Sequence, residues 1–457
     1  MIVMKFGGSS VESASAIERV ARIVKAALAR QPVVVVSAMG KTTQQLLTIG
    51  AEAAAGQKDR AHQRLAAVRQ MHEREIGALV RGSSRGQMQQ ILDSESTEMA
   101  DLLQVISAAE ELAPASVDAL SSYGERLSSR LIALVLPNFG IDSEHVDARC
   151  VVLTDARHKA ALPLYSRTYA RCREKIVPLV SGRKVPVLGG FIGATETGVT
   201  TTLGRGGSDF SAAIVGAGIG ADEIQIWTDV DGVMTCDPKL VPEAHRVKTI
   251  SFAEAAELAY FGAKVLHPST LLPAMERNIP VVVLNSRRPE ITGTRIVADS
   301  LPCANVIKAI SCKRGIHTVN IRSTRMLMAH GFLNRIFEIF HRAETAVDML
   351  ASSEVSVSVT IDDPARLPEI CRALREFSEV SVESDQAIIC IVGDNLRHTP
   401  GVAARAFGAL QGINIRMISQ GASLLNIGFV VAASDAERAV KLLHQEFFRA
   451  VDPAVFD

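Results

Sequence analysis

The sequence predicts an α/β protein in which a large domain with a mainly parallel sheet precedes two smaller α+β units. Through the first two-thirds of the chain, short apolar runs alternate with longer amphipathic runs. This alternation is typical of parallel strands joined by helices that cover both faces of the sheet. The last third instead contains two diverged copies of one pattern, at residues 331–363 and 401–433. Internal duplication of this kind predicts two similar small domains.

The elements of the first part can be placed from their periodicity. Residues 15–30 carry apolar side chains at helical spacing and are expected to form an amphipathic helix. Residues 44–112 are expected to be rich in helix, and residues 251–262 to form a later helix. Strands are expected at 2–6, 32–38, 185–193, 223–230 and 280–286. The alternation ends near Ile296, where a linker is expected.

Each copy in the last third begins with a glycine and continues as an amphipathic helix and two strands. A strand is expected before each copy and a helix after it: strands at 317–323 and 387–393, helices at 366–376 and 435–448. The second unit then lacks one strand, which residues 308–314 would supply, so that the two halves interleave. The predicted parts are a domain at 1–297, a linker at 298–307, and small domains at 308–386 and 387–457.

Composition limits the class of protein. The 457 residues are 47% apolar and 21% charged, and 49 basic residues balance 49 acidic ones. These values are typical of soluble globular proteins and give no indication of nucleic-acid binding. The seven cysteines are widely spaced without a CxxC pair, which favours free thiols in a reducing compartment over a metal cluster. With neither a signal-peptide pattern nor a membrane-length apolar run, the expected location is the cytoplasm.

Two short motifs resemble nucleotide-binding loops but fail on context. GAGIGA at 216–221 follows a predicted helix rather than a strand and lacks the GxGxxG spacing of dinucleotide-binding loops. MGKTT at 39–43 ends like a Walker loop, but Val35 stands where the first glycine is required. Neither motif predicts a cofactor site.

Glycine-rich and polar segments follow several predicted strands, where ligands bind in open parallel sheets. These segments are KFGGSS (5–10), SAMGKTT (37–43), GGFIG (189–193) and TDVDGVMTCDPK (228–239), together with TTLGRGGSD (201–209) before an apolar helical run. Bare backbone, lysine, arginine and aspartate at one edge of a sheet suit a polyanion. Phosphoryl transfer requires this combination of donors, cations and carboxylates.

The motifs KFGGSS, TTLGRGGSD, TDVDGVMTCDP and FGAKVLHP (261–268) together resemble the signature set of aspartate kinases, which have the amino-acid-kinase fold. The resemblance covers nearly the whole chain, because the C-terminal pair looks like ferredoxin-like ACT domains. It is strongest to the monofunctional, lysine-sensitive type, and the chain is too short for a fused homoserine dehydrogenase. The resemblance implies that ATP with Mg²⁺ phosphorylates the side-chain carboxylate of L-aspartate. The product would be L-4-aspartyl phosphate, the first intermediate toward lysine, threonine and methionine.

The resemblance also assigns residues to roles. Lys5 and Asp209 would be catalytic, with Lys5 neutralising the transferred phosphoryl group and Asp209 orienting Lys5. The substrate-binding set would be Thr43, Glu125, Arg205, Gly206, Gly207 and Ser208, in which Arg205 takes the α-carboxylate and Glu125 the α-ammonium group of aspartate. The nucleotide-binding set would be Lys5, Gly7, Gly8, Ser9, Thr228, Asp229, Met234, Lys239, Lys264 and Val265. Magnesium would be held mainly by the ATP phosphates, without a metal site of protein ligands.

Several of these assignments have simpler alternatives. Lys5 is alternatively a surface lysine at a strand end, and Glu125 an acidic residue near a helix N-terminus. The family often has an aromatic residue at the position of Met234, which leaves packing against the nucleotide base open. His267 is interpreted as structural, because a carboxylate nucleophile is already ionised at neutral pH and needs no base.

The segment around residues 326–354 resembles the lysine-binding ACT unit of lysine-inhibited aspartokinases. Asp348 would bind the side-chain ammonium of the effector, within a set of Met326, Gly331, Phe332, Leu333, Val347, Ser353 and Glu354. A solvated loop is the alternative, and threonine is the alternative effector. Such sites usually form between two ACT units, so a homodimer is expected, with a tetramer left open.

Two other functions remain open from the sequence. One is a kinase of the same fold that acts on glutamate or a related acid. The other is a non-catalytic sensor of amino acids built on an inactive kinase fold.

Overall fold

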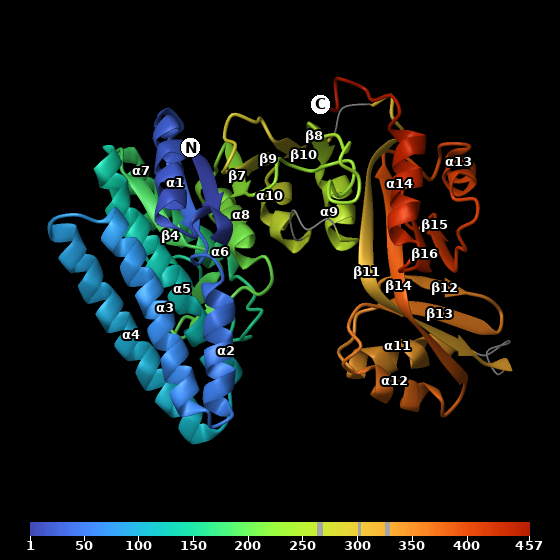
Figure 1. Cartoon of the computed structure of the whole chain (residues 1–457), viewed down its shortest axis with the longest axis horizontal. Helices are drawn as coiled ribbons and strands as arrows, with labels where there is room; N and C mark the ends of the chain where they lie inside the picture. The colour runs from blue at the N-terminus through green and yellow to red at the C-terminus, as the bar shows by residue number, and fades with distance from the viewer. Residues whose placement is uncertain (263–267, 300–302, 325–329) are drawn as a thin grey trace. The chain divides into compact units, whose positions relative to one another are not determined.

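The computed structural model describes residues 1–262, 268–299, 303–324 and 330–457 (Figure 1). The chain divides into two compact units, and each is described by itself. Unit 1 comprises Met1–Val233, Thr249–Phe252 and Val265–Ser300, and unit 2 comprises Met234–Lys248, Ala253–Lys264 and Leu301–Asp457. Two segments that precede residue 297 therefore group with the C-terminal part. The predicted domain boundaries stay a prediction. No described helix is long and apolar enough to cross a membrane.

Unit 1 is built on an eight-stranded sheet in the order β3-β4-β2-β1-β7-β9-β10-β8. Neighbouring strands are parallel except for the antiparallel pair β9 and β10. The predicted mainly parallel sheet is thus confirmed. The strands are β1 (Ile2–Phe6), β2 (Pro32–Val36), β3 (Ser143–Val146), β4 (Val185–Gly189), β7 (Glu223–Thr228), β8 (Thr249–Ser251), β9 (Val281–Asn285) and β10 (Thr294–Val297), with a separate hairpin of β5 (Ile192–Ala194) and β6 (Thr200–Thr202).

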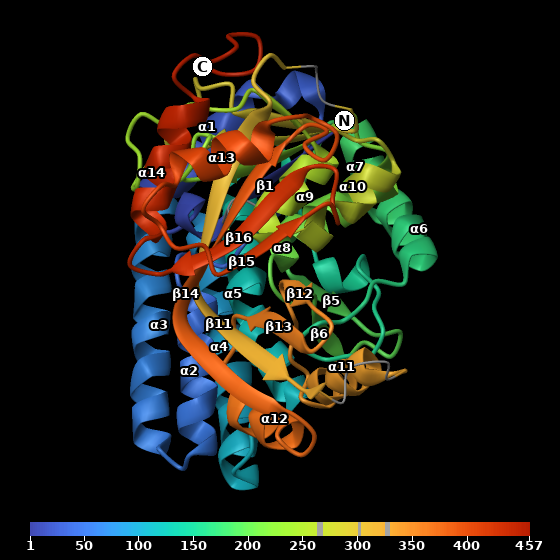
Figure 2. The same cartoon turned by 90° about the vertical axis from the view of Figure 1, so that its right-hand side faces the viewer.

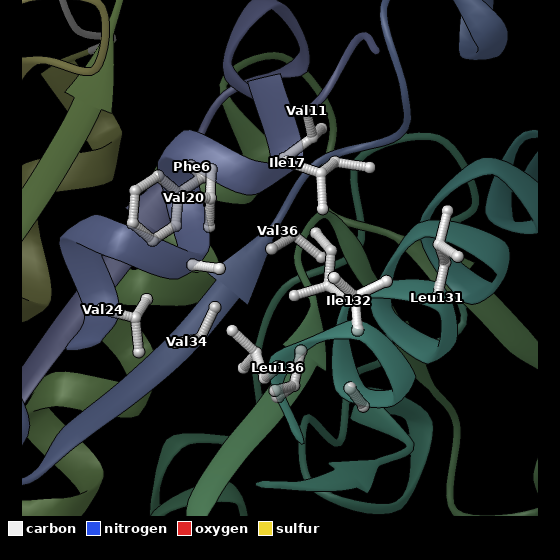
Figure 3. Packing of buried hydrophobic residues seen from close by; sticks show 14 of the residues in the cluster. Phe6, Val11, Ile17, Val20, Val24, Val34, Val36, Leu131, Ile132 and Leu136 are labelled. Carbon is white, nitrogen blue, oxygen red and sulfur yellow. The ribbon is translucent and has the colours of Figure 1, made fainter. Parts of the chain in front are cut away.

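The two faces of the sheet pack against different helices. Because side chains alternate along a strand, Met4 and Phe6 share one face of β1, where they join a core with α1 and α5 (Figure 3). Val3 lies on the other face, which α8 covers. A Cβ atom added to Gly216 of α8 would lie 2.7 Å from Ile224 and 3.7 Å from Val3, so a small residue is needed there. Lys5 falls on this second face of β1.

The helices of unit 1 mostly follow the predicted pattern. The helix expected at 15–30 ends at Ala26, and the strand expected at 185–193 divides into β4 and β5 because Phe191 has a φ of 66°. A second apolar cluster joins α2, α3, α4 and α5. The helices are α1 (Ala14–Ala26), α2 (Thr42–Ala54), α3 (Lys58–Leu79), α4 (Ser83–Ala109), α5 (Pro114–Val135), α6 (Tyr165–Lys175), α7 (Val177–Ser181), α8 (Gly207–Ile219) and α10 (Leu272–Glu276), with short 3-10 turns η1 (Gly8–Ser10), η2 (Leu28–Arg30), η3 (Leu136–Phe139), η4 (Ala148–Cys150) and η5 (Pro268–Leu271).

Unit 2 contains a six-stranded antiparallel sheet in the order β12-β13-β11-β14-β16-β15. Figure 2 shows its two long central strands, β11 and β14, running through the whole sheet. The strands expected at 308–314 and 317–323 are one continuous strand, β11, whose first part pairs with residues 387–393 and whose second part pairs with β13. The strands are β11 (Ile307–Arg322), β12 (Leu350–Ser352), β13 (Ser356–Ile361), β14 (Glu379–Gly393), β15 (Met417–Gln420) and β16 (Asn426–Ala432).

Five helices lie in the part of unit 2 that the structure describes. Helices α11 and α12 share an apolar cluster with β11 and β13, whereas Phe407 of α13 packs edge-on against Phe429 of β16. Helix α9 precedes residue 297 yet contacts the six-stranded sheet, where buried Glu254 pairs with buried Lys308 at 2.9 Å. The helices are α9 (Phe252–Tyr260), α11 (Phe332–Arg342), α12 (Leu367–Leu374), α13 (Val402–Ala409) and α14 (Ala436–Phe447).

Candidate active site and effector site

The ends of β1 and β4 meet the first turn of α8 in unit 1. A Cβ atom on Gly190, directly after β4, would lie 2.8 Å from the Cα atom of Ser208, so the two backbones are in close contact. A Cβ atom on Gly189 would lie 3.0 Å from the carbonyl oxygen of Glu125 on α5. Glycine at these positions permits an approach that any side chain would block. The predicted residues of three separate motifs are thereby brought together.

Lys5 and Asp209 form an ion pair at the centre of this region. The Nζ atom of Lys5 lies 2.6 Å from Oδ1 of Asp209, and their side chains are only 10% and 15% exposed. The pair follows from the fold, because Lys5 projects from the face of β1 that α8 covers and Asp209 lies in the first turn of α8. Lys5 is therefore a buried, anchored cation, which excludes the alternative of a surface lysine.

The first turn of α8 has a backbone conformation that only glycine adopts readily. Gly206 is the N-cap residue, with a φ of 71°. Because glycine has no side chain, no side-chain oxygen of the N-cap residue accepts from the first N–H groups of the helix. Ser208 and Asp209 both lie inside the helix, in its first turn. Within the described residues, no acceptor is found for the N–H groups of Ser208 and Asp209. Such N–H groups at the positive end of a helix dipole suit an anion.

Arg205 is exposed beside this turn. It stands between Gly204 and Gly206, which both have positive φ, and no ion pair of Arg205 is found in the described part of the chain. An exposed guanidinium group without an acidic partner is available for a carboxylate ligand.

The loop after β1 corrects one detail of the predicted phosphate site. The N–H of Gly7 donates to the carbonyl oxygen of Trp227 at 3.0 Å, so this N–H is not available to a nucleotide, although Gly7 belongs to the nucleotide-binding set that the resemblance implies. Gly8 must be glycine, because a Cβ atom there would lie 2.8 Å from the carbonyl oxygen of Gly40. Among the described residues, the N–H groups of Gly8 and Ser9 have no acceptor. These two groups, rather than that of Gly7, remain candidates.

Glu125 lies in the middle of α5 and is 3% exposed. The alternative of an acidic residue at a helix N-terminus is therefore wrong. Burial raises the pKa of Glu125 to about 8, although a hydrogen bond with the backbone of Ala38 works in the opposite direction. Its Oε2 atom is buried without a hydrogen-bond partner. A buried carboxyl group in this condition is stabilised in its ionised form by a cationic ligand.

The remaining predicted residues of the active site are spread over both units. In unit 1, Thr43 is half-buried in the first turn of α2, and Thr228 at the end of β7 donates to Asp229 at 3.3 Å. In unit 2, Met234 is half-buried and Lys239 is exposed. Three further residues, Lys264, Val265 and His267, lie outside the described residues.

Asp231 and Asp118 are two polar residues near the predicted motifs to which the sequence assigned no role in the site. Asp231, which follows β7, accepts from Asn285 at 2.6 Å and pairs with Arg288, so it stabilises the turn. Asp118 is completely buried on α5 and accepts from Lys159 and from Thr202, which ends β6 shortly before Arg205. The available signal for Asp118 was its spacing, because a residue seven before Glu125 lies on the same face of the helix.

The residues present fit a phosphate ligand better than a metal ion. No cluster of three or more His, Cys, Asp or Glu side chains arranged to hold a metal ion is found in the described ranges. The free N–H groups of α8 and the Lys5 ammonium instead match the charge of ATP phosphate oxygens.

The predicted effector carboxylate lies in unit 2 within a cluster of charges. Oδ1 of Asp348 lies 2.7 Å from Nζ of Lys313, which is also 2.8 Å from Oδ2 of Asp362 and stands over the ring of Tyr260. The side chain of Asp348 is 4% exposed, which excludes the alternative of a solvated loop for this residue. Burial raises the pKa of Asp348, and the hydrogen bond with Lys313 opposes this shift. The Lys313 ammonium group thus contacts both carboxylates.

The other predicted effector residues that the structure describes lie at the start of α11 and on either side of β12. Gly331 has a φ of 81° and begins α11, where Phe332 is half-buried against Phe377 and Leu333 is exposed. The remainder lie in or after the segment that leads to β12: Val347 is half-buried, Ser353 pairs with Ser356, and Glu354 is exposed. Met326 lies outside the described residues.

Comparison with known proteins agrees with this geometry over nearly the whole chain. Residues 1–285 match the amino acid kinase family, and residues 389–447 match an ACT domain. The chain is 38% identical to chloroplastic aspartokinase 1 of Arabidopsis thaliana, across 98% of this chain and 80% of that protein. It is 35% identical to lysine-sensitive aspartokinase 3 of Escherichia coli strain K12, across 98% and 99% of the two chains.

Solved structures give the same result. The fold is similar to crystal structures of E. coli aspartokinase III, at 34% identity and with 98% of this chain and 100% of that chain covered. The TM-score is 0.86 for its complex with aspartate and ADP and 0.83 for its complex with lysine and aspartate. The chain therefore belongs to the aspartokinase family and is an aspartate kinase.

Proposed function

We propose that this aspartate kinase transfers the γ-phosphoryl group of ATP to the side-chain carboxylate of L-aspartate, forming L-4-aspartyl phosphate. The observation that carries the proposal is the buried ion pair of Lys5 and Asp209 at the first turn of α8. The E. coli relative binds aspartate and ADP in its crystal structure. The reaction would be the first step toward lysine, threonine and methionine in the cytoplasm.

In this proposal each residue acts by position and charge. ATP with Mg²⁺ supplies the phosphoryl group, and the phosphates carry the metal. Lys5 neutralises charge on the transferred group, while Asp209 fixes the position of the Lys5 ammonium. Positioning and charge stabilisation are the main contributions of a protein to phosphoryl transfer.

The substrate is held at its two α-groups. Arg205 donates two hydrogen bonds to the α-carboxylate in a bidentate pair. Glu125 accepts from the α-ammonium group, which compensates the cost of ionising a buried carboxyl group whose pKa is about 8. The side-chain carboxylate is then the group left free to attack.

The product assay separates this proposal from its two rivals. The protein is incubated with ATP, Mg²⁺ and either L-aspartate or L-glutamate, and acyl phosphate is trapped with hydroxylamine. We expect hydroxamate from aspartate and little from glutamate. Hydroxamate from glutamate would favour the other amino-acid kinase, and nucleotide binding without any hydroxamate would favour the sensor.

We further propose that L-lysine inhibits the enzyme through Asp348 in a homodimer joined by the ACT domains. The support is the name of the lysine-sensitive E. coli relative and the crystal structure of its lysine complex. In this chain, the Lys313 ammonium group pairs with both Asp348 and Asp362, and the side chain of Asp348 is 4% exposed. A buried carboxylate such as Asp348 suits the side-chain ammonium group of lysine. Inhibition would follow if lysine binds one arrangement of the enzyme better than the other.

Replacing Asp348 by Asn is expected to raise the lysine concentration for half-inhibition at least tenfold, with kcat in the absence of lysine unchanged. The charge that binds the effector ammonium is removed, and an ion pair of this kind contributes on the order of 1.4 kcal/mol or more. Inhibition curves for the wild type, Asp348→Asn and the exposed-acid control Glu376→Gln test this. An unchanged curve for Asp348→Asn would refute the site.

Replacing Gly207 by Ala is expected to destabilise unit 1 by about 1–3 kcal/mol through overpacking. A Cβ atom there would lie 2.6 Å from the ring of Phe191 and 3.2 Å from its Cα atom. The control is Gly86→Ala in α4, where a Cβ atom meets nothing within 4 Å. Urea unfolding measures both. Equal stability of the two variants would contradict the close approach of the β4–β5 loop to α8.

A further inference from the structure

Asp118 is a completely buried carboxylate with three donors from two separate segments, the loop that contains His158 and Lys159 and the strand β6. It accepts from the N–H of Lys159 at 2.9 and 3.1 Å, from Oγ1 of Thr202 at 2.6 Å and from Nδ1 of His158 at 2.8 Å. An ionised carboxylate only accepts, so Nδ1 of His158 carries the hydrogen. A buried charge is costly unless it is fully paired. The network therefore fixes both segments on α5.

Both segments border the backbone around Arg205. Thr202 ends β6 and is separated from Arg205 by Leu203 and Gly204 alone. The carbonyl oxygen of Lys159 lies 3.1 Å from the position of a Cβ atom on Gly204. Lys159 thus donates its N–H to Asp118 and supports the backbone beside Arg205 with its carbonyl group.

Backbone hydrogen bonds fix the chain on both sides of Arg205, which is the one exposed residue in the segment 202–207. Leu203 donates its N–H to Phe191 at 2.9 Å, and Gly207 donates to Gly204 at 3.0 Å. The backbone on both sides of Arg205 is therefore held, whereas its guanidinium group is exposed and, within the described residues, has no acidic partner. A fixed backbone that carries an exposed guanidinium group lowers the conformational entropy lost when the group binds a carboxylate.

We infer that Asp118 is a positioning residue for aspartate, acting through Thr202 and Lys159 to hold Arg205 at the site of the substrate's α-carboxylate. The inference rests on the proposed role of Arg205. Because Asp118 is completely buried and its oxygens accept from protein donors, its removal is expected to act on aspartate binding through Arg205 and to weaken that binding selectively. A purely structural role would lower stability without this selectivity.

The test compares steady-state kinetics of Asp118→Asn, Thr202→Val and Thr202→Ser with the wild type. We expect Asp118→Asn to raise KM for aspartate at least tenfold, with KM for ATP within twofold. Thr202→Val should show part of this effect, whereas Thr202→Ser, which keeps the hydroxyl donor, should behave like the wild type. The control is Glu75→Gln, which removes a different buried carboxylate of unit 1 that accepts from the N–H of Ala14.

A double-mutant cycle with Arg205→Ala decides whether Asp118 acts through Arg205. If it does, the double variant should be no worse in KM for aspartate than Arg205→Ala alone, because coupled residues are not additive. Additive increases, or equal increases in both KM values, would overturn the inference. If Asp118→Asn does not fold, the cycle is run with Thr202→Val.

The two proposals fail separately. A wild type that forms no hydroxamate from aspartate refutes the proposed function. A wild type that is active, with KM for aspartate unchanged in Asp118→Asn, refutes only the inference about Asp118.

Discussion

Asp209→Asn is expected to lower kcat by on the order of a hundred- to a thousandfold, the range seen when one preorganised charge is lost from a transition-state site. Asp209 holds the Lys5 ammonium at 2.6 Å in a region where both side chains are largely buried. Without the carboxylate, Lys5 has no fixed position, and its charge is no longer aligned with the transferred group. Because asparagine has nearly the same shape, the packing of α8 is expected to remain.

The measurement pairs the hydroxamate assay with far-UV circular dichroism and a thermal melt. Asp101→Asn is the control, since Asp101 is an exposed acid on α4 of the same unit. A folded Asp209→Asn protein with kcat within tenfold of the wild type would contradict the assignment. If Asp209→Asn shows neither activity nor a cooperative thermal transition, Lys5→Arg is the better variant to test, because arginine can still pair with Asp209.

Glu125→Gln is expected to change stability and substrate binding in opposite directions. The folded-state pKa of Glu125, about 8, lies above the ordinary value of 4.5. Between these two pH values, Glu125 is therefore protonated in the folded protein and ionised in the unfolded chain. The wild type therefore loses stability as pH rises from about 4.5 to about 8, and this loss is complete above pH 8. The shift corresponds to on the order of 5 kcal/mol, at about 1.4 kcal/mol per pKa unit. Glutamine avoids this cost, so the variant should be the more stable protein at pH 9.

Substrate binding should respond in the other direction, because glutamine offers no charge to the α-ammonium group of aspartate. We expect KM for aspartate to rise at least tenfold in Glu125→Gln, with KM for ATP little changed. Urea unfolding at pH 5 and pH 9, together with KM for both substrates, tests the two effects. Equal stability of the variant and the wild type at pH 9 would contradict the burial of an ionisable group at this position.

The fold of unit 1 could be predicted because its strands are fully apolar and its helices amphipathic. The pattern failed where local backbone geometry decides the ends of elements. At Phe191, a φ of 66° separates β4 from β5 inside a continuous apolar run. In the last third, two predicted strands are one, because Gly315 joins them with an irregular register rather than a turn. Such joins depend on pairing with a distant strand, which composition does not reveal.

The candidate site was predictable where its residues lie in motifs at the ends of predicted strands and helices. Lys5 and Asp209 could be expected to meet, because the end of β1 and the start of α8 share one face of a parallel sheet. The partner of the Gly7 N–H, a carbonyl oxygen 220 positions away at Trp227, could not be expected. Nor could the pairing of Lys313 with Asp348, which depends on side chains from separate elements of unit 2. The roles of these residues in catalysis and inhibition stay predictions.

The two long strands of unit 2 have a consequence for how that sheet unfolds. β11 and β14 each pass through both halves of the six-stranded sheet. Each half therefore forms some of its interstrand hydrogen bonds with a strand that continues into the other half. Neither half can unfold without disrupting a strand that also forms part of the other half. Hydrogen exchange is therefore expected to find one slow-exchanging block across both strands rather than two blocks of different stability. A single proteolytic cut within β14 would be expected to release both halves together.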